Sequence, residues 1–184
     1  MSIFDLRIDT ARLLLRPTAA EDFEPWVAFA ADPVVMQHLG GVQPRAMAWR
    51  MFTGMAGAWH LHGFAMFSVI EKSSGRWIGR IGPWRPEGWP GTEVGWSLIR
   101  DAWGKGYAAE AATAAIDWAF AELGWTDVIH TISPANVESK ALAARLDSRY
   151  LRMARLPAPH DLECELWGQS REEWVANAVK RAGR

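Results

Sequence analysis

One segment constrains the fold of this chain more than any other. A strand-like run over 92–99 leads into a short loop with Gly104 and Gly106, and a long helical pattern over 107–123 begins directly after it. Small residues recur along one face of that helix, which allows close packing on a sheet. The segment predicts a mixed α/β domain in which this helix covers a sheet.

The same loop has the properties of an anion site. Gly104 and Gly106 permit backbone conformations that a Cβ would hinder, and the first helical turn offers unpaired N–H groups with a partial positive charge. A phosphate or pyrophosphate suits such a place, with Lys105 or Arg100 adding charge. A helix start that needs only a tight turn is the alternative explanation of the two glycines, so both interpretations stay open.

Two common nucleotide motifs fit this loop poorly. A Walker loop requires Ser or Thr after Gly-Lys, whereas Gly106 follows Lys105. A dinucleotide fingerprint needs a third small residue, which Ala109 could supply, but that motif normally follows the first strand of the fold. Here the glycines follow several strands and helices.

The remaining periodicity predicts alternating strands and helices. A capping-box spacing at Thr18 predicts a helix that starts there and ends before Asp32, with a kink or restart at Pro25. Asn136 is a plausible N-cap of a later helix. Besides 92–99, the expected strands are 12–16, 64–70, 76–82, 127–133, 150–156 and 163–168; besides 107–123, the later helices are 44–59, 136–146 and 171–181, the last with Trp174, Ala178 and Val175 facing inward.

Length and composition bound the remaining choices. The 184 residues suffice for one core, so we expect a single domain over 1–184. Twenty basic and 21 acidic residues give a net charge of -1, which argues against a nucleic-acid partner. No run approaches the ~18 apolar residues of a spanning helix, and the start lacks the apolar core of a signal peptide. We therefore expect a cytoplasmic protein without a membrane partner.

The run Trp-Gly-Lys-Gly-Tyr-Ala-Ala-Glu-Ala over 103–111 resembles the acetyl-CoA-binding motif of the GNAT superfamily of N-acetyltransferases. It is most similar to the branch that includes the ribosomal-protein alanine N-acetyltransferases. The resemblance covers about 11–168 and leaves 169–184 as a C-terminal helical extension. Other segments resemble the family in the same order along the chain: 12–17, 32–36, 79–82, 93–96 and 136–139.

The resemblance implies an α/β (α+β) fold: a mixed, largely antiparallel sheet flanked by helices, with a splay between the central fourth and fifth strands. Acetyl-CoA would lie at the splay, with its thioester carbonyl near a backbone N–H of the fourth strand. Asn136 and Ser139 would contact the pantetheine arm. The pyrophosphate would bind the loop residues Trp103, Gly104, Lys105, Gly106, Tyr107 and Ala108. No metal is implied.

The sequence departs from the family pattern at two places. Asp101 stands where the family often has Gln or Arg, so backbone amides should suffice for the pyrophosphate. The run Leu-Asp-Ser-Arg-Tyr over 146–150 replaces the usual Leu-Gly-Phe, and the family pattern therefore does not define the turn there.

Acetyl transfer to an amine needs a proton acceptor, a polarised carbonyl and a stabilised thiolate. Glu93, beside the splay, is our candidate general base, acting through water, and desolvation would raise its pKa. An exposed carboxylate paired with a cation is the alternative. Ser139 is the candidate for stabilising the thiolate, against a solvent-facing serine. Asn136 combines a cap with a contact to pantetheine or substrate, against a cap alone.

Other candidates have stronger structural interpretations. His130 lies within the fifth strand, where a structural role is favoured over proton transfer. Glu110 suits the helix dipole. Lys140 or Arg145 could meet the 3′-phosphate of CoA, although a solvated helix face explains each. Cys164 lies late in the chain, which argues against a cysteine relay.

The acceptor stays open between a protein N-terminus and a small-molecule amine, and a homodimer is compatible with the sequence. His60 and His62 form a metal-like pair without an apparent third ligand, so exposed residues are the simpler interpretation. Two other functions remain: a non-catalytic acyl-CoA-binding sensor, and an interaction domain that binds another phosphate ligand. Several tryptophans hint at an aromatic acceptor pocket, although a Trp-rich core explains them equally: Trp26, Trp49, Trp59, Trp84 and Trp89.

Overall fold

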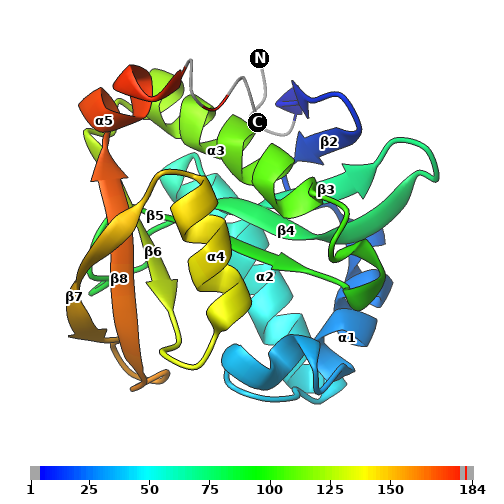
Figure 1. Ribbon diagram of the computed structural model, residues 1–184. Helices are drawn as coiled ribbons and strands as arrows, with labels where there is room; N and C mark the ends of the chain where they lie inside the picture. The colour runs from blue at the N-terminus through cyan, green and yellow to red at the C-terminus, as the bar shows by residue number, and fades with distance from the viewer. Residues whose placement is uncertain (1–4, 179–180, 182–184) are drawn as a thin grey trace.

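The computed structural model describes residues 5–178 and 181. Its strands form one sheet in the order β1-β2-β3-β4-β5-β6-β8-β7, and every neighbouring pair is antiparallel except β5 and β6 (Figure 1). The mixed, largely antiparallel sheet is confirmed. The strands are β1 Ile8–Asp9, β2 Leu13–Arg16, β3 Phe67–Glu71, β4 Arg76–Trp84, β5 Glu93–Leu98, β6 Asp127–Ile132, β7 Arg149–Arg155 and β8 Glu163–Ser170.

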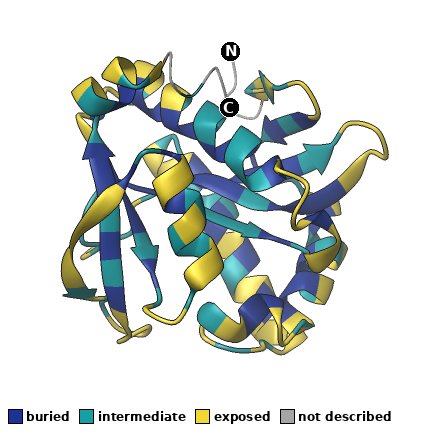
Figure 2. Cartoon of the chain, viewed as in Figure 1, coloured by how far each residue is buried: buried dark blue, intermediate teal, exposed yellow. Residues whose placement is uncertain are grey.

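Helices flank both faces of this sheet. Tyr107 on α3 and Ser139 on α4 bond to β3 and β5 on one face, whereas Trp26 on α1 packs against Trp77 on the other. Figure 2 shows largely buried central strands, an exposed edge strand β7, and exposed residues on the outer sides of the helices. The helices are α1 Phe23–Ala31, α2 Arg45–His62, α3 Tyr107–Glu122, α4 Val137–Arg145 and α5 Arg171–Ala176, with short 3-10 turns at Ala20–Asp22, Val35–His38 and Arg100–Ala102.

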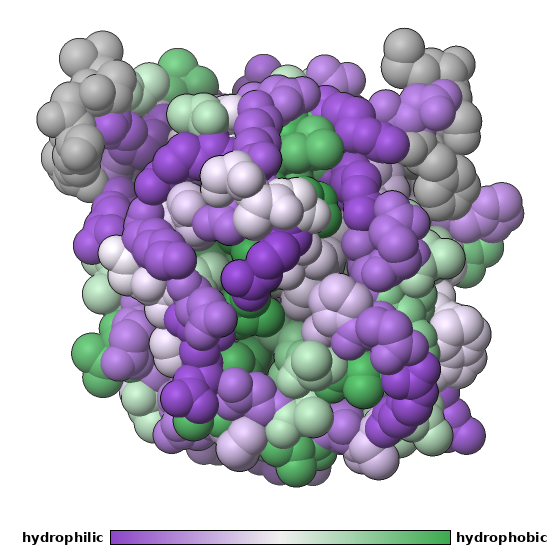
Figure 3. Space-filling view, turned by 90° about the vertical axis from the view of Figure 1, so that its right-hand side faces the viewer, coloured by the Kyte–Doolittle hydropathy of each residue, from purple (hydrophilic) through white to green (hydrophobic). Residues whose placement is uncertain are grey.

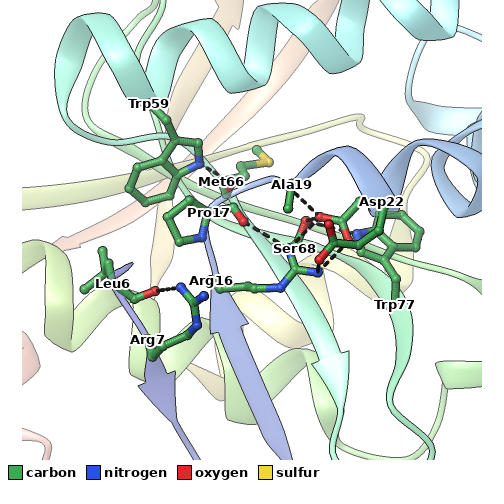
Figure 4. Close-up of polar contacts among 11 residues, drawn as sticks. Leu6, Arg7, Arg16, Pro17, Ala19, Asp22, Trp59, Met66, Ser68 and Trp77 are labelled. Carbon is green, nitrogen blue, oxygen red and sulfur yellow. Dashed lines mark hydrogen bonds and ion pairs between the residues drawn. The ribbon is translucent and has the colours of Figure 1, made fainter. Parts of the chain in front are cut away.

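A buried ion pair fixes how the chain enters α1 (Figure 4). Asp22 is 1% exposed, and its two carboxylate oxygens each accept a 2.8 Å bond from the Arg16 guanidinium. The same carboxylate accepts bonds from the Ser68 hydroxyl at 2.6 Å and the Ala19 N–H at 3.0 Å. This buried pair, whose carboxylate accepts four hydrogen bonds, ties β2 and β3 to the start of α1.

This cluster corrects the predicted helix start at Thr18. The chain first forms the 3-10 turn Ala20–Asp22, and α1 begins only at Phe23, because Asp22 rather than Glu21 binds the Ala19 N–H. Pro25 then lies in the first turn of α1, where its missing N–H breaks no helical bond. The predicted interruption at Pro25 is therefore wrong.

The C-terminal end also differs from expectation. Strand β8 continues to Ser170, so the predicted extension over 169–184 begins in a strand, and α5 starts behind a capping box of Ser170 and Glu173. Trp174 is buried as predicted, but Val175 and Ala178 are exposed, so their predicted inward orientation is wrong. Residues 179–180 and 182–184 lie outside the described part of the chain. Within the described part, no helix is both long enough and apolar enough to cross a membrane.

Candidate functional site

Strands β5 and β6 diverge at the centre of the sheet. Their parallel pairing is confined to Glu93 and Ile129, where the Ile129 N–H donates to the Thr92 carbonyl at 2.9 Å. One step further, the Thr131 N–H donates at 3.2 Å to the Glu93 side chain instead of a β5 carbonyl. The predicted splay between the fourth and fifth strands of the family pattern is this gap, and side chains fill the ladder positions that the backbone leaves open.

Glu93 is the carboxylate at the origin of the gap. It is 4% exposed; its Oε1 also accepts a 2.9 Å bond from the Thr131 hydroxyl, and its Oε2 accepts a bond from the Trp89 indole N–H. Burial raises the pKa of Glu93 to about 7, although the bonds from Thr131 and Trp89 and the charge of Arg80 oppose the rise. The exposed-carboxylate interpretation is therefore wrong, and the group exchanges protons near neutral pH.

His130 holds the other side of the gap. Its Nδ1 lies 2.7 Å from the Val94 carbonyl, which can only accept, so Nδ1 carries the proton and Nε2 accepts from the Ser148 hydroxyl at 2.9 Å. Gln169 donates to that hydroxyl at 2.9 Å. Burial lowers the pKa of His130 to about 4, so the ring is neutral. Both ring nitrogens are engaged, which favours the structural interpretation of His130.

The N-terminus of α4 borders the gap from the α3 side. Asn136 caps the helix, because its Oδ1 accepts a 3.0 Å bond from the Ser139 N–H; the predicted cap is confirmed. The Ser139 hydroxyl accepts a 3.2 Å bond from the Trp96 indole N–H on β5. Ser139 therefore faces the sheet beside the gap, and its own O–H remains available as a donor.

The turn after α4 keeps a left-handed residue without glycine. Asp147 has φ of 64°, and its N–H bonds to the Ala144 carbonyl while the Ser148 N–H bonds to the Ala143 carbonyl, each at 3.0 Å. This is the Schellman arrangement that glycine usually completes. Aspartate is among the residues that tolerate the left-handed region, so the departure over 146–150 changes the residue and preserves a defined turn.

The glycine loop presents backbone donors to solvent. Gly104 and Gly106 have φ of 71° and 78°, and Gly106 is the N-cap of α3 with no side chain bonded to the first helical N–H groups. Lys105 is exposed beside them. Trp103 is 48% exposed and donates its indole N–H to the Leu98 carbonyl at 2.8 Å. The loop thus has the geometry that suits an anion.

The side chains of two residues in the first turn of α3 are bonded to neighbouring elements. Tyr107 is buried and donates its hydroxyl to Glu71 at 2.7 Å, so only its backbone, like that of Ala108, can serve a ligand at the loop. Glu110 accepts bonds from the Thr10 hydroxyl at 2.6 Å and from the Arg12 guanidinium at 2.7 Å. The structural interpretation of Glu110 is favoured, because these bonds anchor α3 to the start of β2.

Several secondary candidates lie elsewhere. Lys140 donates to the Pro134 carbonyl at 2.7 Å and to Glu165 at 3.2 Å. These bonds engage the ammonium that the sequence offered as a contact for the 3′-phosphate of CoA. Cys164 is 3% exposed, and burial raises the pKa of its thiol to about 11, which agrees with the expectation against a cysteine relay. His60 and His62 are exposed at the end of α2.

The tryptophans divide between the core, the surface and the site. Trp26 and Trp59 are buried in the main core, so they belong to the Trp-rich core of the alternative interpretation. Trp49 is 51% exposed on α2. Trp84 is partly buried, and Trp89 contacts the Glu93 carboxylate from the β4–β5 loop. Of these five, Trp89 thus donates to a proposed site residue, and Trp84 is paired with Glu93 across the β4–β5 ladder; outside this set, Trp96 donates to Ser139.

Sequence reasoning missed three groups around the gap. Thr131 and Trp89 hold the Glu93 carboxylate, and neither carries a motif that would have revealed this. Arg80 lies on β4 and acts on the pKa of Glu93 through its charge. The signal for Arg80 was a cation between Gly79 and Gly82 in the interior of a strand pattern whose other cation, Arg76, stands at its start.

A hollow of about 290 Å³ lies at the C-terminal end of α1, away from the gap. On this side of the molecule, hydrophobic residues lie in recesses between hydrophilic ones (Figure 3). The lining of the hollow includes neither Glu93 nor Ser139, so the hollow is separate from the candidate site. The lining residues are Ala28, Phe29, Asp32, Val35, Ile99, Arg100 and Asp101.

Comparisons with known proteins agree with this arrangement. The family model described as an acetyltransferase (GNAT) domain matches residues 12–149. An uncharacterized N-acetyltransferase p20 of Bacillus licheniformis is 31% identical over 71% of this chain and 75% of its own length. An acetyltransferase structure from Agrobacterium tumefaciens superimposes with a TM-score of 0.79 and 32% identity over 89% of this chain and 94% of that one. Mycobacterium smegmatis RimJ, solved in complex with CoA-disulfide, shares the fold at a TM-score of 0.69 and 20% identity, covering 94% of this chain and 90% of that one.

Proposed function

Since the chain belongs to the acetyltransferase (GNAT) family and is thus of the acyltransferase class, we propose that it transfers the acetyl group of acetyl-CoA directly to a primary amine. The observation that carries the proposal is the enclosed Glu93 carboxylate at the origin of the β5–β6 gap. A base with a pKa of about 7 suits the deprotonation of an ammonium near neutral pH.

The loop residues fit the pyrophosphate of acetyl-CoA. The first-turn N–H groups of α3 have no side-chain cap, and Gly104 and Gly106 leave space for close approach to the backbone. Lys105 adds a positive charge, and Trp103, Tyr107 and Ala108 complete the loop. Acetyl-CoA supplies the acetyl thioester as acyl donor, and Asn136 and Ser139 border the path of its pantetheine arm.

The two faces of β5 carry different groups of the proposed site. Side chains alternate along a strand, and Trp96 reaches Ser139 on the α3–α4 face. Glu93, three residues from Trp96, therefore belongs to the opposite face, which α1 and α2 cover. We infer that acetyl-CoA approaches from the α3–α4 face and the amine from the α1–α2 face, with the gap between them.

Each residue then has a defined role. Glu93, once ionised, accepts the proton of the acceptor ammonium through a water molecule. The Val94 carbonyl points across the gap to His130, so the Trp96 N–H, two residues on, points the same way and can polarise the thioester carbonyl. Ser139 donates its hydroxyl proton in a hydrogen bond to the departing sulfur.

The test is an acceptor screen. Protein N-terminal peptides and small-molecule amines are offered with acetyl-CoA, and both free CoA and acetylated product are measured by mass spectrometry. Product on an amine supports the proposal and identifies the acceptor class. Tight binding of acetyl-CoA without product on any amine would favour the non-catalytic sensor. Displacement of acetyl-CoA by ATP in a thermal-shift assay would favour the other phosphate ligand.

A further inference from the structure

Arg80 lies on the same face of the sheet as Glu93. It is paired across the β4–β5 ladder with Ser97, and partners in an antiparallel pair share a face. Ser97 and Glu93 are four residues apart on β5, so they also share a face. The Arg80 guanidinium lies 4.9 Å from the ring centre of Trp26 and 6.0 Å from that of Phe29, both on α1.

This cation lacks an anionic partner. In the part of the chain that the structure describes, Arg80 makes no ion pair, and its buried Nε has no hydrogen-bond acceptor. Arg16 on the same sheet shows the usual solution, because Asp22 meets its guanidinium with two bonds. A desolvated cation without such a partner is costly, and aromatic faces compensate only part of that cost.

The surroundings leave room for an external anion. The Arg80 side chain as a whole is partly exposed although Nε is enclosed, so the terminal Nη groups remain for a ligand. Burial lowers the pKa of Arg80 to about 10, so the group still carries its charge at neutral pH. Glu93 raises that pKa through its charge but forms no ion pair with Arg80.

We propose that Arg80 binds an anionic group of the acceptor, so that preferred acceptors carry a carboxylate or similar anion several bonds from the amine. This inference rests on the proposed acetyl transfer and adds the acceptor class. Ser97, the β5 partner of Arg80, is four residues from Glu93, which is about 13 Å along the strand. In this proposal the acceptor spans the distance between the two side chains, with its amine at Glu93 and its anion at Arg80.

The experiment compares acceptors that differ only in charge. Glycine, 4-aminobutyrate, 6-aminohexanoate and peptides with an internal Asp are each paired with the matching amide or Asn peptide. The kcat/KM for CoA release is measured for each pair. The wild type should prefer the anionic member of its best pair roughly tenfold or more, as for a charge-assisted bond.

Variants assign that preference to Arg80. Arg80→Gln should abolish the preference, so that the ratio of kcat/KM between the anionic and the neutral member falls to about one; any effect that acts through the pKa of Glu93 is common to both members and leaves this ratio unchanged. Arg80→Lys should retain part of the preference, because lysine keeps the charge without the planar fork. Arg76→Gln, on the same strand but exposed, should keep the wild-type ratio. A wild type without preference, or an equal loss for both members of a pair, would overturn the inference.

A binding measurement separates this inference from the proposed function. If no amine releases CoA, acetyl transfer fails, and the anion site is judged with glutarate in a thermal-shift titration at fixed ionic strength. A shift in the wild type and in Arg76→Gln that is absent in Arg80→Gln supports the site. Equal shifts in all three proteins, or none in the wild type, refute it.

Discussion

The two ends of the candidate site are built in different ways. The glycine loop is a continuous exposed segment that offers backbone N–H groups at the start of α3. The β5–β6 gap is enclosed, and its polar groups come from β5, β6, α4 and the loop before β5. Backbone N–H groups do not titrate near neutral pH, whereas the charge state of the gap depends on side chains whose pKa values are set mainly by burial. The loop therefore suits binding at any ordinary pH, and the gap suits proton transfer.

Within the gap, burial acts on two groups in opposite directions. It raises the pKa of Glu93 and lowers the pKa of His130, so the neutral form of each is favoured. The His130 ring is bonded at both nitrogens, to Val94 on β5 and to Ser148, whereas Glu93, with a pKa of about 7, can gain and lose its proton in the neutral range. The comparison predicts that gap variants change rate and pH dependence, and loop variants change binding.

Glu93→Gln should have the largest effect. It removes the base and keeps the shape, so turnover should fall by roughly 10²- to 10⁴-fold while acetyl-CoA affinity is retained. Wild-type turnover should rise with pH and level off above about 7, and the variant should lose that rise. Steady-state kinetics across pH check this. For acceptor amines of low pKa, turnover should fall less in the variant, because they need less help to lose their proton. Wild-type turnover in the variant would exclude Glu93 as the base.

The same substitution should change the pH dependence of stability. Because the folded-state pKa of Glu93 is raised, the native state holds this proton more tightly than the unfolded state, so the stability from this group falls as pH rises from about 4.5 to about 7. Wild type should lose roughly 2–3 kcal/mol relative to Glu93→Gln between pH 5 and pH 8. Urea unfolding at both values measures the difference. Glu87→Gln, at an exposed position, is the control; parallel curves for wild type and Glu93→Gln would contradict the burial of this charge.

Gly106→Val addresses the other end of the site. Gly106 has φ of 78°, where a side chain costs about 1–2 kcal/mol, and its Cβ would lie 3.4 Å from Arg12 Nη2. The loop should distort and acetyl-CoA affinity should fall more than tenfold. In the wild type, ligand at 100-fold above Kd should add ~2.7 kcal/mol of stability. Gly54→Ala, in open space on α2, should keep the full thermal shift; unchanged affinity in Gly106→Val would remove the loop from the site.

Ser139→Ala tests the α4 border of the gap. Loss of a hydrogen bond to the departing sulfur should slow turnover about tenfold, or ~1.4 kcal/mol in the barrier. The fold should be little affected, because water can reach the Trp96 indole N–H at this half-buried position. Kinetics and a melting curve on the same preparation separate the two effects. Full activity would rule out the thiolate role.

Asn136→Ala should have the smallest effect and a different signature. It removes the cap that accepts from the Ser139 N–H, which typically costs ~1 kcal/mol. The melting temperature should therefore fall together with any loss of activity. Asn136→Ser keeps a capping oxygen and should restore stability. A variant as stable as the wild type would show that this cap contributes little.

Local patterns in the sequence predicted the loop well. The glycines, the start of α3 and the Asn136 cap depend on residues within a few positions of one another, and they appear in the structure where the pattern placed them. The start of α1 was predicted less well, because the Arg16–Asp22 ion pair and the bond from Ser68 on β3 to the same carboxylate decide it. Glu93 was named from its neighbourhood, but its burial depends on Thr131 and Trp89, which no motif links to it.

By itself the sequence determined the order of strands and helices from β2 onward, the anion loop and the resemblance to acetyltransferases, because periodicity, caps and glycines act over short stretches of chain. Only the tertiary structure decided which side chains leave water together. It enclosed Glu93 and His130 in one gap and placed Arg80 against Trp26 with no anionic partner among the residues that the structure describes. The physical reason is that desolvation and long-range charge depend on packing between distant segments, and these terms set the pKa values and the anion affinity of the site.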